Sequence, residues 1–200
     1  MVYFDLECHL GTLYKIEAFA LDGGIIQDNF SMITDAKRPD VVRKIKGITI
    51  KQSQTGADER QTILAFWDFL LRNKAVAPQQ IILKGIEYYK ISCIGFGVCR
   101  DLQKIFHRYD IHITYDKNKE FCGDLYEFAQ NYCNHLPVES FRQNILKHYF
   151  LIRETGLSAL PLLQKKLVNE TTRSLTKKEC IRLSARLMIL TKKGKELSFC

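Results

Sequence analysis

No stretch of this 200-residue sequence is apolar for long. A membrane-spanning helix needs ~18 or more consecutive apolar residues, and no run here approaches that length. The first residues, MVYFDLECHLG, also lack the charged segment followed by an apolar segment that is typical of a secretory signal. We therefore expect a cytoplasmic protein with no membrane partner.

Cysteine pairs are missing as well. The seven cysteines are an odd number, and no two of them are spaced as Cys-x-x-Cys. This argues against a disulfide framework, so we expect reduced thiols, many of them filling the core. Cys133 and His135 lie too close together in the sequence to resemble a zinc-finger pair.

Acidic residues are scarce near the C-terminus. From Lys165 to Glu196 there are ten basic residues and three acidic ones, so this segment holds +7 of the net charge of +8. Concentrated positive charge is expected of a protein that binds a phosphate backbone. The alternative is that these charges coat the solvated face of a helix.

Two carboxylates, Asp5 and Glu7, stand near the end of the first apolar segment. This segment is predicted to be a buried strand that runs into a turn. Residues two apart in a strand point to the same face of the sheet, ~6 to 7 Å apart along the chain. Such a pair can hold a divalent cation such as Mg²⁺ or Mn²⁺, or it can be a pair of polar residues at the solvent end of a strand.

The first half of the chain predicts three antiparallel strands followed by a helix, as the start of a single domain over residues 1–200. Alternating apolar residues indicate strands over 13–21 and 25–33, joined by a turn at Asp22-Gly23-Gly24. Residues 34–58 are predicted to be a loop with a short helix. Asp58 begins an amphipathic helix whose predicted inward residues are Ile63, Phe66, Trp67, Leu70 and Leu71.

The second half predicts two more strands and then helices. Residues 79–83 suit a central parallel strand reached by a helix crossover, residues 87–109 are expected to be mostly helical, and residues 111–115 suit a fifth strand. The predicted C-terminal helices are 124–133, 138–154, 158–168 and 174–191. The fold class is therefore α/β, with a mixed five-stranded sheet flanked by helices on both faces.

This order of elements, with Asp-x-Glu on the first strand, resembles the ribonuclease H-like fold of the DEDD-type (DnaQ-like) 3′-to-5′ exonuclease superfamily. The residues that carry the resemblance are Asp5-Leu6-Glu7 with Gly11, the hairpin at Gly23-Gly24, Ile45-Lys46-Gly47-Ile48-Thr49, Phe66-Trp67-Asp68-Phe69-Leu70, and the segment GLSALPLLQKKL at 156–167. The resemblance covers almost the whole chain and rests on the order of these motifs. It implies the exonuclease fold and, in active members, metal-dependent hydrolysis from a 3′ end.

The second and third motifs of that superfamily are degenerate here. By the resemblance, Tyr89 stands in place of the second-motif aspartate, Thr172 replaces the general-base histidine, and Lys177 replaces the last metal-binding aspartate. Two-metal hydrolysis needs a base and enough carboxylates to hold two cations ~3.5 to 4 Å apart, whereas Asp5 and Glu7 alone hold at most one cation, weakly. Other alignments use Glu87 or Asp101 as the second-motif acid, Glu179 as the last aspartate, or His148, with Glu154 nearby, as the base. A cysteine nucleophile at Cys8 is not expected, because the adjacent His9 points to the opposite face of a strand.

The sequence thus predicts an exonuclease-fold protein that binds a single nucleic-acid strand or its 3′ end with weak or no catalysis. Asp5, Glu7 and the turn at 8–11, with His9 and Gly11, are expected to form the floor of a groove. The predicted wall is the basic C-terminal helix, with Arg173, Lys177 and Lys178, and Lys177 would pair with a phosphate without cleaving it. Two alternatives remain: a divergent but active Mg²⁺- or Mn²⁺-dependent 3′-to-5′ exonuclease, and a protein-interaction module on the same scaffold.

Overall fold

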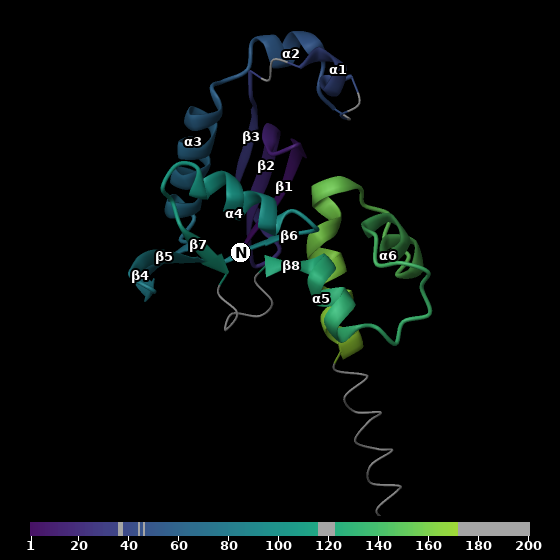
Figure 1. Ribbon diagram of the computed structural model, residues 1–200. Coiled ribbons are helices and arrows are strands. Elements are labelled where there is room, and N and C mark those ends of the chain that lie inside the picture. Colours follow the sequence, from purple (N-terminus) through teal and green to yellow (C-terminus); the bar gives the residue numbers. More distant parts are fainter. Residues whose placement is uncertain (36–37, 44, 46, 116–122, 172–200) are drawn as a thin grey trace, which may run out of the picture.

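A five-stranded sheet forms the centre of the computed structural model, which describes residues 1–35, 38–43, 45, 47–115 and 123–171 (Figure 1). The strands lie in the order β3-β2-β1-β6-β8. Their bounds are Val2–His9 (β1), Thr12–Asp22 (β2), Ile25–Ile33 (β3), Cys93–Gly95 (β6) and Gly123–Asp124 (β8). β1 pairs antiparallel with β2 and parallel with β6, and β6 pairs parallel with β8. The sheet is therefore mixed and five-stranded, as the sequence predicts, and the strand that carries Asp5 and Glu7 lies at its centre.

Tight turns join the first three strands. Gly23 and Gly24 both have positive φ angles, +55° and +84°, which the predicted hairpin turn requires. The turn between β1 and β2 uses Leu10 and Gly11, with φ of +48° and +79°. A leucine in this left-handed region is uncommon and strained. The strained turn follows directly after the strand that bears the two carboxylates.

A second, three-stranded sheet holds the segments that the sequence assigned to the main sheet. Its order is β4-β5-β7, with bounds Val76–Leu83, Ile86–Ile91 and Ile113–Tyr115. The prediction of a central parallel strand at 79–83 is wrong, because β4 pairs antiparallel with β5 in this sheet. Lys84 and Gly85, with φ of +53° and +78°, form a two-residue hairpin turn between β4 and β5, which the sequence pattern does not predict. The predicted strand at 111–115 exists as β7, but it pairs parallel with β5.

The predicted helix over 87–109 is correct only in its last part. β5 and β6 occupy its first half, and α4 spans Cys99–His107. The short β6, Cys93–Gly95, is fully buried and provides the fourth strand of the main sheet. Three residues are too few to show a strand period in the sequence.

Helices α3 (Glu59–Arg72) and α4 cover one face of the main sheet. Val2, Phe4 and Leu6, which alternate along β1, are buried in one cluster with Phe66 of α3 and Leu102 of α4. Asp58 caps α3 as predicted and accepts hydrogen bonds from the backbone nitrogens of Arg60 (2.8 Å) and Gln61 (3.2 Å). The inward placement of Leu71 is wrong: its side chain is exposed, and Phe69 takes its place in the core.

The loop after β3 contains two short helices instead of the one expected. They are α1 (Pro39–Val42) and α2 (Ile50–Gln54). Val41, Val42 and Ile48 form a small buried cluster with Tyr14 of β2. This loop is therefore anchored to the same strand that carries Lys15 and Glu17.

The opposite face of the sheet carries the C-terminal helices. These are α5 (Leu125–Tyr132), α6 (Gln143–Tyr149), the 3₁₀ turn η1 (Gly156–Ala159) and a helix over residues 160–171. Tyr3 of β1 is buried in one cluster with Leu125, Leu146 and Leu163 from these helices. Helices thus cover both faces, as predicted. The helix expected over 138–154 is shortened to α6, and the one expected over 174–191 lies outside the described residues.

The helices of the described chain include none that is both long enough and apolar enough to cross a bilayer. The assignment of residues 1–200 to one domain stays a prediction.

Candidate functional site

Asp5 and Glu7 lie side by side on the face of β1 that is turned toward the C-terminal helices. They share that face with Tyr3, whereas Phe4 and Leu6 point into the core beneath α3 and α4. Both carboxylates are half-buried. The predicted pair of converging acids is therefore present at the end of the central strand.

A third carboxylate and a lysine stand across from this pair on β2. In the register of the two strands, Asp5 lies opposite Glu17 and Glu7 lies opposite Lys15. Opposite residues of antiparallel strands share a face, with Cβ atoms ~4.5 to 5.5 Å apart. Lys15 Nζ lies 2.8 Å from Glu17 Oε1, and the lysine side chain is only 16% exposed. We name Asp5, Glu7, Lys15 and Glu17 the carboxylate–lysine cluster.

The pKa values of Asp5 and Glu7 reflect this crowding. Burial is the main cause that raises the pKa of Asp5, with a further rise from Glu17, while a hydrogen bond from the Leu6 backbone nitrogen (3.0 Å) and the charge of Lys15 act in the opposite direction. Burial also raises the pKa of Glu7, and the charge of Asp5 adds to the rise. Lys15 is thus the positive charge that counters the mutual repulsion of these carboxylates.

The donors of this cluster fit a weakly held divalent cation. Asp5 and Glu7 supply the hard oxygen ligands that Mg²⁺ and Mn²⁺ prefer. However, Glu17 is engaged by Lys15. Within the part of the chain that the structure describes, no group of three or more His, Cys, Asp or Glu side chains is placed to hold a metal ion.

Cys8 belongs to the other face of β1. It packs against the core cluster of α3 and α4, and burial raises the pKa of its thiol to about 12, with further rises from Asp101 and Glu59. A thiol with such a pKa is protonated near neutral pH and is a poor nucleophile. This agrees with the expectation from the sequence that Cys8 is not catalytic.

The structure relocates the residues considered for the second motif. Tyr89 lies in β5 of the small sheet, where its ring packs edge-on against Trp67 at 5.1 Å, and Glu87 is an exposed residue of the same strand. Neither is on the main sheet, so the alignment that put Tyr89 in the site is wrong. Asp101 is in the first turn of α4, the helix that follows β6, and its charge acts on Cys8 next to Glu7. Of the acids considered, Asp101 is the one whose place in the fold is close to β1.

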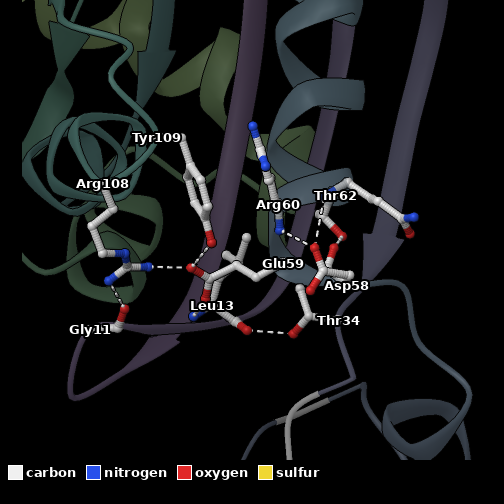
Figure 2. Close-up of polar contacts among 10 residues, drawn as sticks. Gly11, Leu13, Thr34, Asp58, Glu59, Arg60, Thr62, Arg108 and Tyr109 are labelled. Atoms are coloured by element: carbon white, nitrogen blue, oxygen red, sulfur yellow. Dashed lines mark hydrogen bonds and ion pairs between the residues drawn. The ribbon is translucent and has the colours of Figure 1, made fainter.

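The turn after the carboxylates is held by a network that sequence reasoning missed (Figure 2). Arg108, which follows α4, donates hydrogen bonds to the Gly11 carbonyl oxygen and to Glu59 Oε1. Glu59 also accepts hydrogen bonds from the Leu13 backbone nitrogen (3.0 Å) and from the Tyr109 hydroxyl (2.9 Å). These contacts join residues about 50 to 100 positions apart, so no local pattern reveals them. They leave His9, Leu10 and Gly11 exposed at a fixed turn.

The helix over residues 160–171 lies against the same face of β1 as the carboxylates. Gln164 Oε1 accepts a 2.6 Å hydrogen bond from the Tyr3 hydroxyl, and η1 at the start of the helix also contacts β1. Figure 1 shows this helix beginning near the C-terminal end of β1 and running back along the strand. Lys165 and Lys166, the first residues of the basic segment, are exposed on it. Arg173, Lys177, Lys178, Thr172 and Glu179 lie outside the described residues.

His148, considered as a displaced base, is an exposed residue in the last turn of α6. Glu154 is exposed in the segment between α6 and η1. Neither contacts the carboxylate–lysine cluster through any hydrogen bond or ion pair that the structure shows among its described residues.

No protein-family model matches this chain, and no curated protein matches its sequence. Among solved structures, a similar chain comes from a structure of 3′-end-specific recognition of the histone mRNA stem-loop by a 3′-exonuclease. The match has a TM-score of 0.51 and 15% sequence identity, and it covers 90% of this chain and 82% of that chain. Identity this low establishes the fold alone. The chain has an α/β fold of the ribonuclease H-like exonuclease type, with its Asp5–Glu7 pair on the central strand.

Proposed function

We propose that this protein binds a single nucleic-acid strand at its 3′ end, on an exonuclease fold with weak or no catalytic activity. The observation that supports this best is the half-buried pair of Asp5 and Glu7 at the end of the central strand, beside a fixed, exposed turn. The similar solved chain recognises a 3′ end of RNA. Because fold does not determine function, the similarity to this solved structure supports the proposal only in part, and the main support comes from the site.

The groove is built from two parts. Its floor is Asp5, Glu7 and the turn with His9 and Gly11, which Arg108 holds in place through the Gly11 carbonyl. Its wall is the helix that starts beside β1 and exposes Lys165 and Lys166. We propose that the wall continues into Arg173, Lys177 and Lys178, which bind phosphates by charge-assisted hydrogen bonds.

Catalysis is proposed to be weak because the cation is weakly held. Asp5 and Glu7 would hold Mg²⁺ or Mn²⁺, which would supply Lewis-acid stabilisation of the phosphate. Thr172 and Lys177 take the places of the general base and the last ligand by the resemblance to the exonuclease superfamily. The protein is proposed to act in the cytoplasm, in keeping with its free cysteines Cys8, Cys99 and Cys133.

Two observations favour other functions. Asp101 lies in the first turn of α4, and it would serve as the second-motif acid of a divergent but active exonuclease. Ile82, Leu83 and Ile86 at the tip of the β4–β5 hairpin are exposed, as on a protein-interaction module.

Fluorescence anisotropy tests the proposed function. Linear and circular single-stranded oligonucleotides of RNA and of DNA are titrated with wild-type protein in EDTA, and the linear strand is expected to bind more tightly. Lys177→Ala should weaken binding of the linear strand most, whereas Lys192→Ala should weaken both alike. Absence of binding at low salt would favour the interaction module, and equal affinity for linear and circular strands would remove the 3′ end from the proposal.

A further inference from the structure

The carboxylate–lysine cluster contains an internal cation. Lys15 Nζ is 2.8 Å from Glu17 Oε1, and its side chain is 16% exposed. On its other side lies the loop after β3, since a Cβ added to Gly47 would be 3.7 Å from this nitrogen. The ammonium group therefore lies between the Glu17 carboxylate and Gly47, on a side chain that is mostly buried.

The pairing of β1 with β2 brings this ammonium group next to the carboxylates. Lys15 lies opposite Glu7, and Glu17 lies opposite Asp5, on one face of the sheet. The bulge in this strand pair falls between Glu7 and Cys8, on the turn side of the four residues. It sets the register in which Lys15 lies opposite Glu7, and regular antiparallel pairing then continues to Asp5 and Glu17.

We infer that Lys15 is the resident counter-ion of Asp5, Glu7 and Glu17, and that it keeps divalent cations from binding tightly to this site. The inference rests on the proposed function only in taking Asp5 and Glu7 as the cation ligands. A dication that approaches these two residues meets the ammonium charge, and it also finds Glu17 already engaged. Cation affinity depends on the number of free carboxylate ligands and on the local charge, so both effects weaken binding.

The inference predicts that removal of one charge opens a cation site. Lys15→Met keeps the apolar stem of the side chain and removes the ammonium group. We expect Mn²⁺, followed by the electron paramagnetic resonance signal of the free ion, to bind this variant about tenfold or more tightly than wild type. Lys15→Arg retains the charge and should bind Mn²⁺ as wild type does. Lys51→Met, at an exposed lysine of α2, is the matched control and should leave the affinity unchanged.

A second variant locates the gained site. Adding Asp5→Asn to Lys15→Met should abolish the gain, because Asp5 is one of the two ligands. Equal Mn²⁺ affinity of wild type and Lys15→Met overturns the inference, and so does a gain that survives Asp5→Asn. If Lys15→Met does not fold, Lys15→Gln replaces it, with the same expected gain and the same two contrary results.

The proposed function and the role of Lys15 are tested by separate results. Strand binding by wild type in EDTA involves no metal, so its absence contradicts the nucleic-acid proposal and leaves the Mn²⁺ result intact. Conversely, equal Mn²⁺ affinities of wild type and Lys15→Met overturn the role of Lys15 and say nothing about strand binding.

Discussion

Arg108 ties the Glu59 carboxylate to the Gly11 carbonyl, so one side chain joins the start of α3, the end of α4 and the turn after the central strand (Figure 2). The arginine side chain is 41% exposed and that of Glu59 is 21% exposed, so this ion pair is only partly screened by water. Because Leu10 and Gly11 both have positive φ angles, the turn needs such support to keep one conformation. The position of the proposed groove floor therefore depends on residues from two distant helices.

The first prediction concerns this tie. Arg108→Met should lower the free energy of unfolding by about 1 to 2 kcal/mol, because Glu59 loses a charged partner while it stays largely buried. Arg100→Met is the matched control: Arg100 belongs to α4, which ends just before Arg108, and its ion pair with Glu127 is exposed, so the loss should be below about 0.5 kcal/mol. Urea unfolding measures both. Equal losses in the two variants would show that the network in Figure 2 adds no stability beyond a surface ion pair.

Several elements follow directly from local sequence patterns. The strands around Gly23-Gly24 alternate clearly, and Asp58 caps α3 where the periodic apolar residues begin. The pair Asp5 and Glu7 falls on one face because a strand has a period of two residues. These predictions succeed because the interactions that decide them lie within a few residues of one another.

The errors arise where pairing partners are distant. β6 and β8 have three and two residues, too short for any pattern, so longer apolar segments at 79–83 and 111–115 were assigned to the main sheet in their place. Because the fourth strand was predicted at 79–83, the residue aligned with the second motif was Tyr89, in the small sheet, instead of a residue on α4. Lys15 and Glu17 could not be placed from the turn alone. A two-residue turn at Leu10-Gly11 with regular pairing puts Tyr14 opposite Glu7, whereas the bulge between Glu7 and Cys8 shifts the register so that Lys15 takes that place. Glu59 and Arg108 could not be paired either, since they are 49 positions apart.

The second prediction is a gain of stability at the site. Burial and neighbouring charge raise the pKa of Asp5, so its ionised form is disfavoured in the folded protein near neutral pH. Asp5→Asn removes the charge and keeps an oxygen that accepts the hydrogen bond from the Leu6 nitrogen. The free energy of unfolding should rise by about 1 kcal/mol, as is common when a functional residue is replaced. A lower melting temperature for Asp5→Asn than for wild type would contradict this.

The third prediction is a loss of stability in acid. Arg72 (2.7 Å) and then Asn73 (2.9 Å) donate hydrogen bonds to Asp28 and lower the pKa of its carboxyl below 3.8, tying β3 to the end of α3. A lowered folded-state pKa means that the contribution is complete above about pH 4 and is lost as the pH falls through the folded-state value. Because the pair is partly exposed, the contribution should stay below about 1 kcal/mol. Urea unfolding at several pH values should show that the difference in free energy of unfolding between wild type and Asp28→Asn shrinks in acid. A difference that stays constant with pH would show that the ionisation of Asp28 does not contribute to stability.

The fourth prediction concerns catalysis. The 3₁₀ turn η1 and the helix that follows it have no histidine among their described residues, 156–171, and a missing general base costs at least about 100-fold in rate. A labelled single strand should therefore be degraded at least about 100-fold more slowly than by an active exonuclease assayed alongside it, with Mg²⁺ or Mn²⁺. Robust digestion that is abolished by Asp5→Ala would establish the active alternative, and its loss in Asp101→Asn would identify Asp101 as the second-motif acid.

The last prediction uses the described start of the basic wall. Lys165 and Lys166 are exposed on the helix that packs against β1 through Leu160, Leu163 and Leu167. A lysine that neutralises a phosphate releases condensed counterion, so the logarithm of the binding constant for a single strand falls against the logarithm of salt with a slope of about −0.7 per phosphate contacted. Replacing Lys165 and Lys166 together by alanine should make the slope shallower by about 1.4 if both reach the strand, and by about 0.7 if one does.

Lys51→Ala on α2 is the control and should keep the wild-type slope, because this lysine lies outside the proposed wall. An unchanged slope in the double variant, with the control also unchanged, would place the strand away from this helix, whereas equal changes in both would indicate non-specific attraction by the whole basic protein.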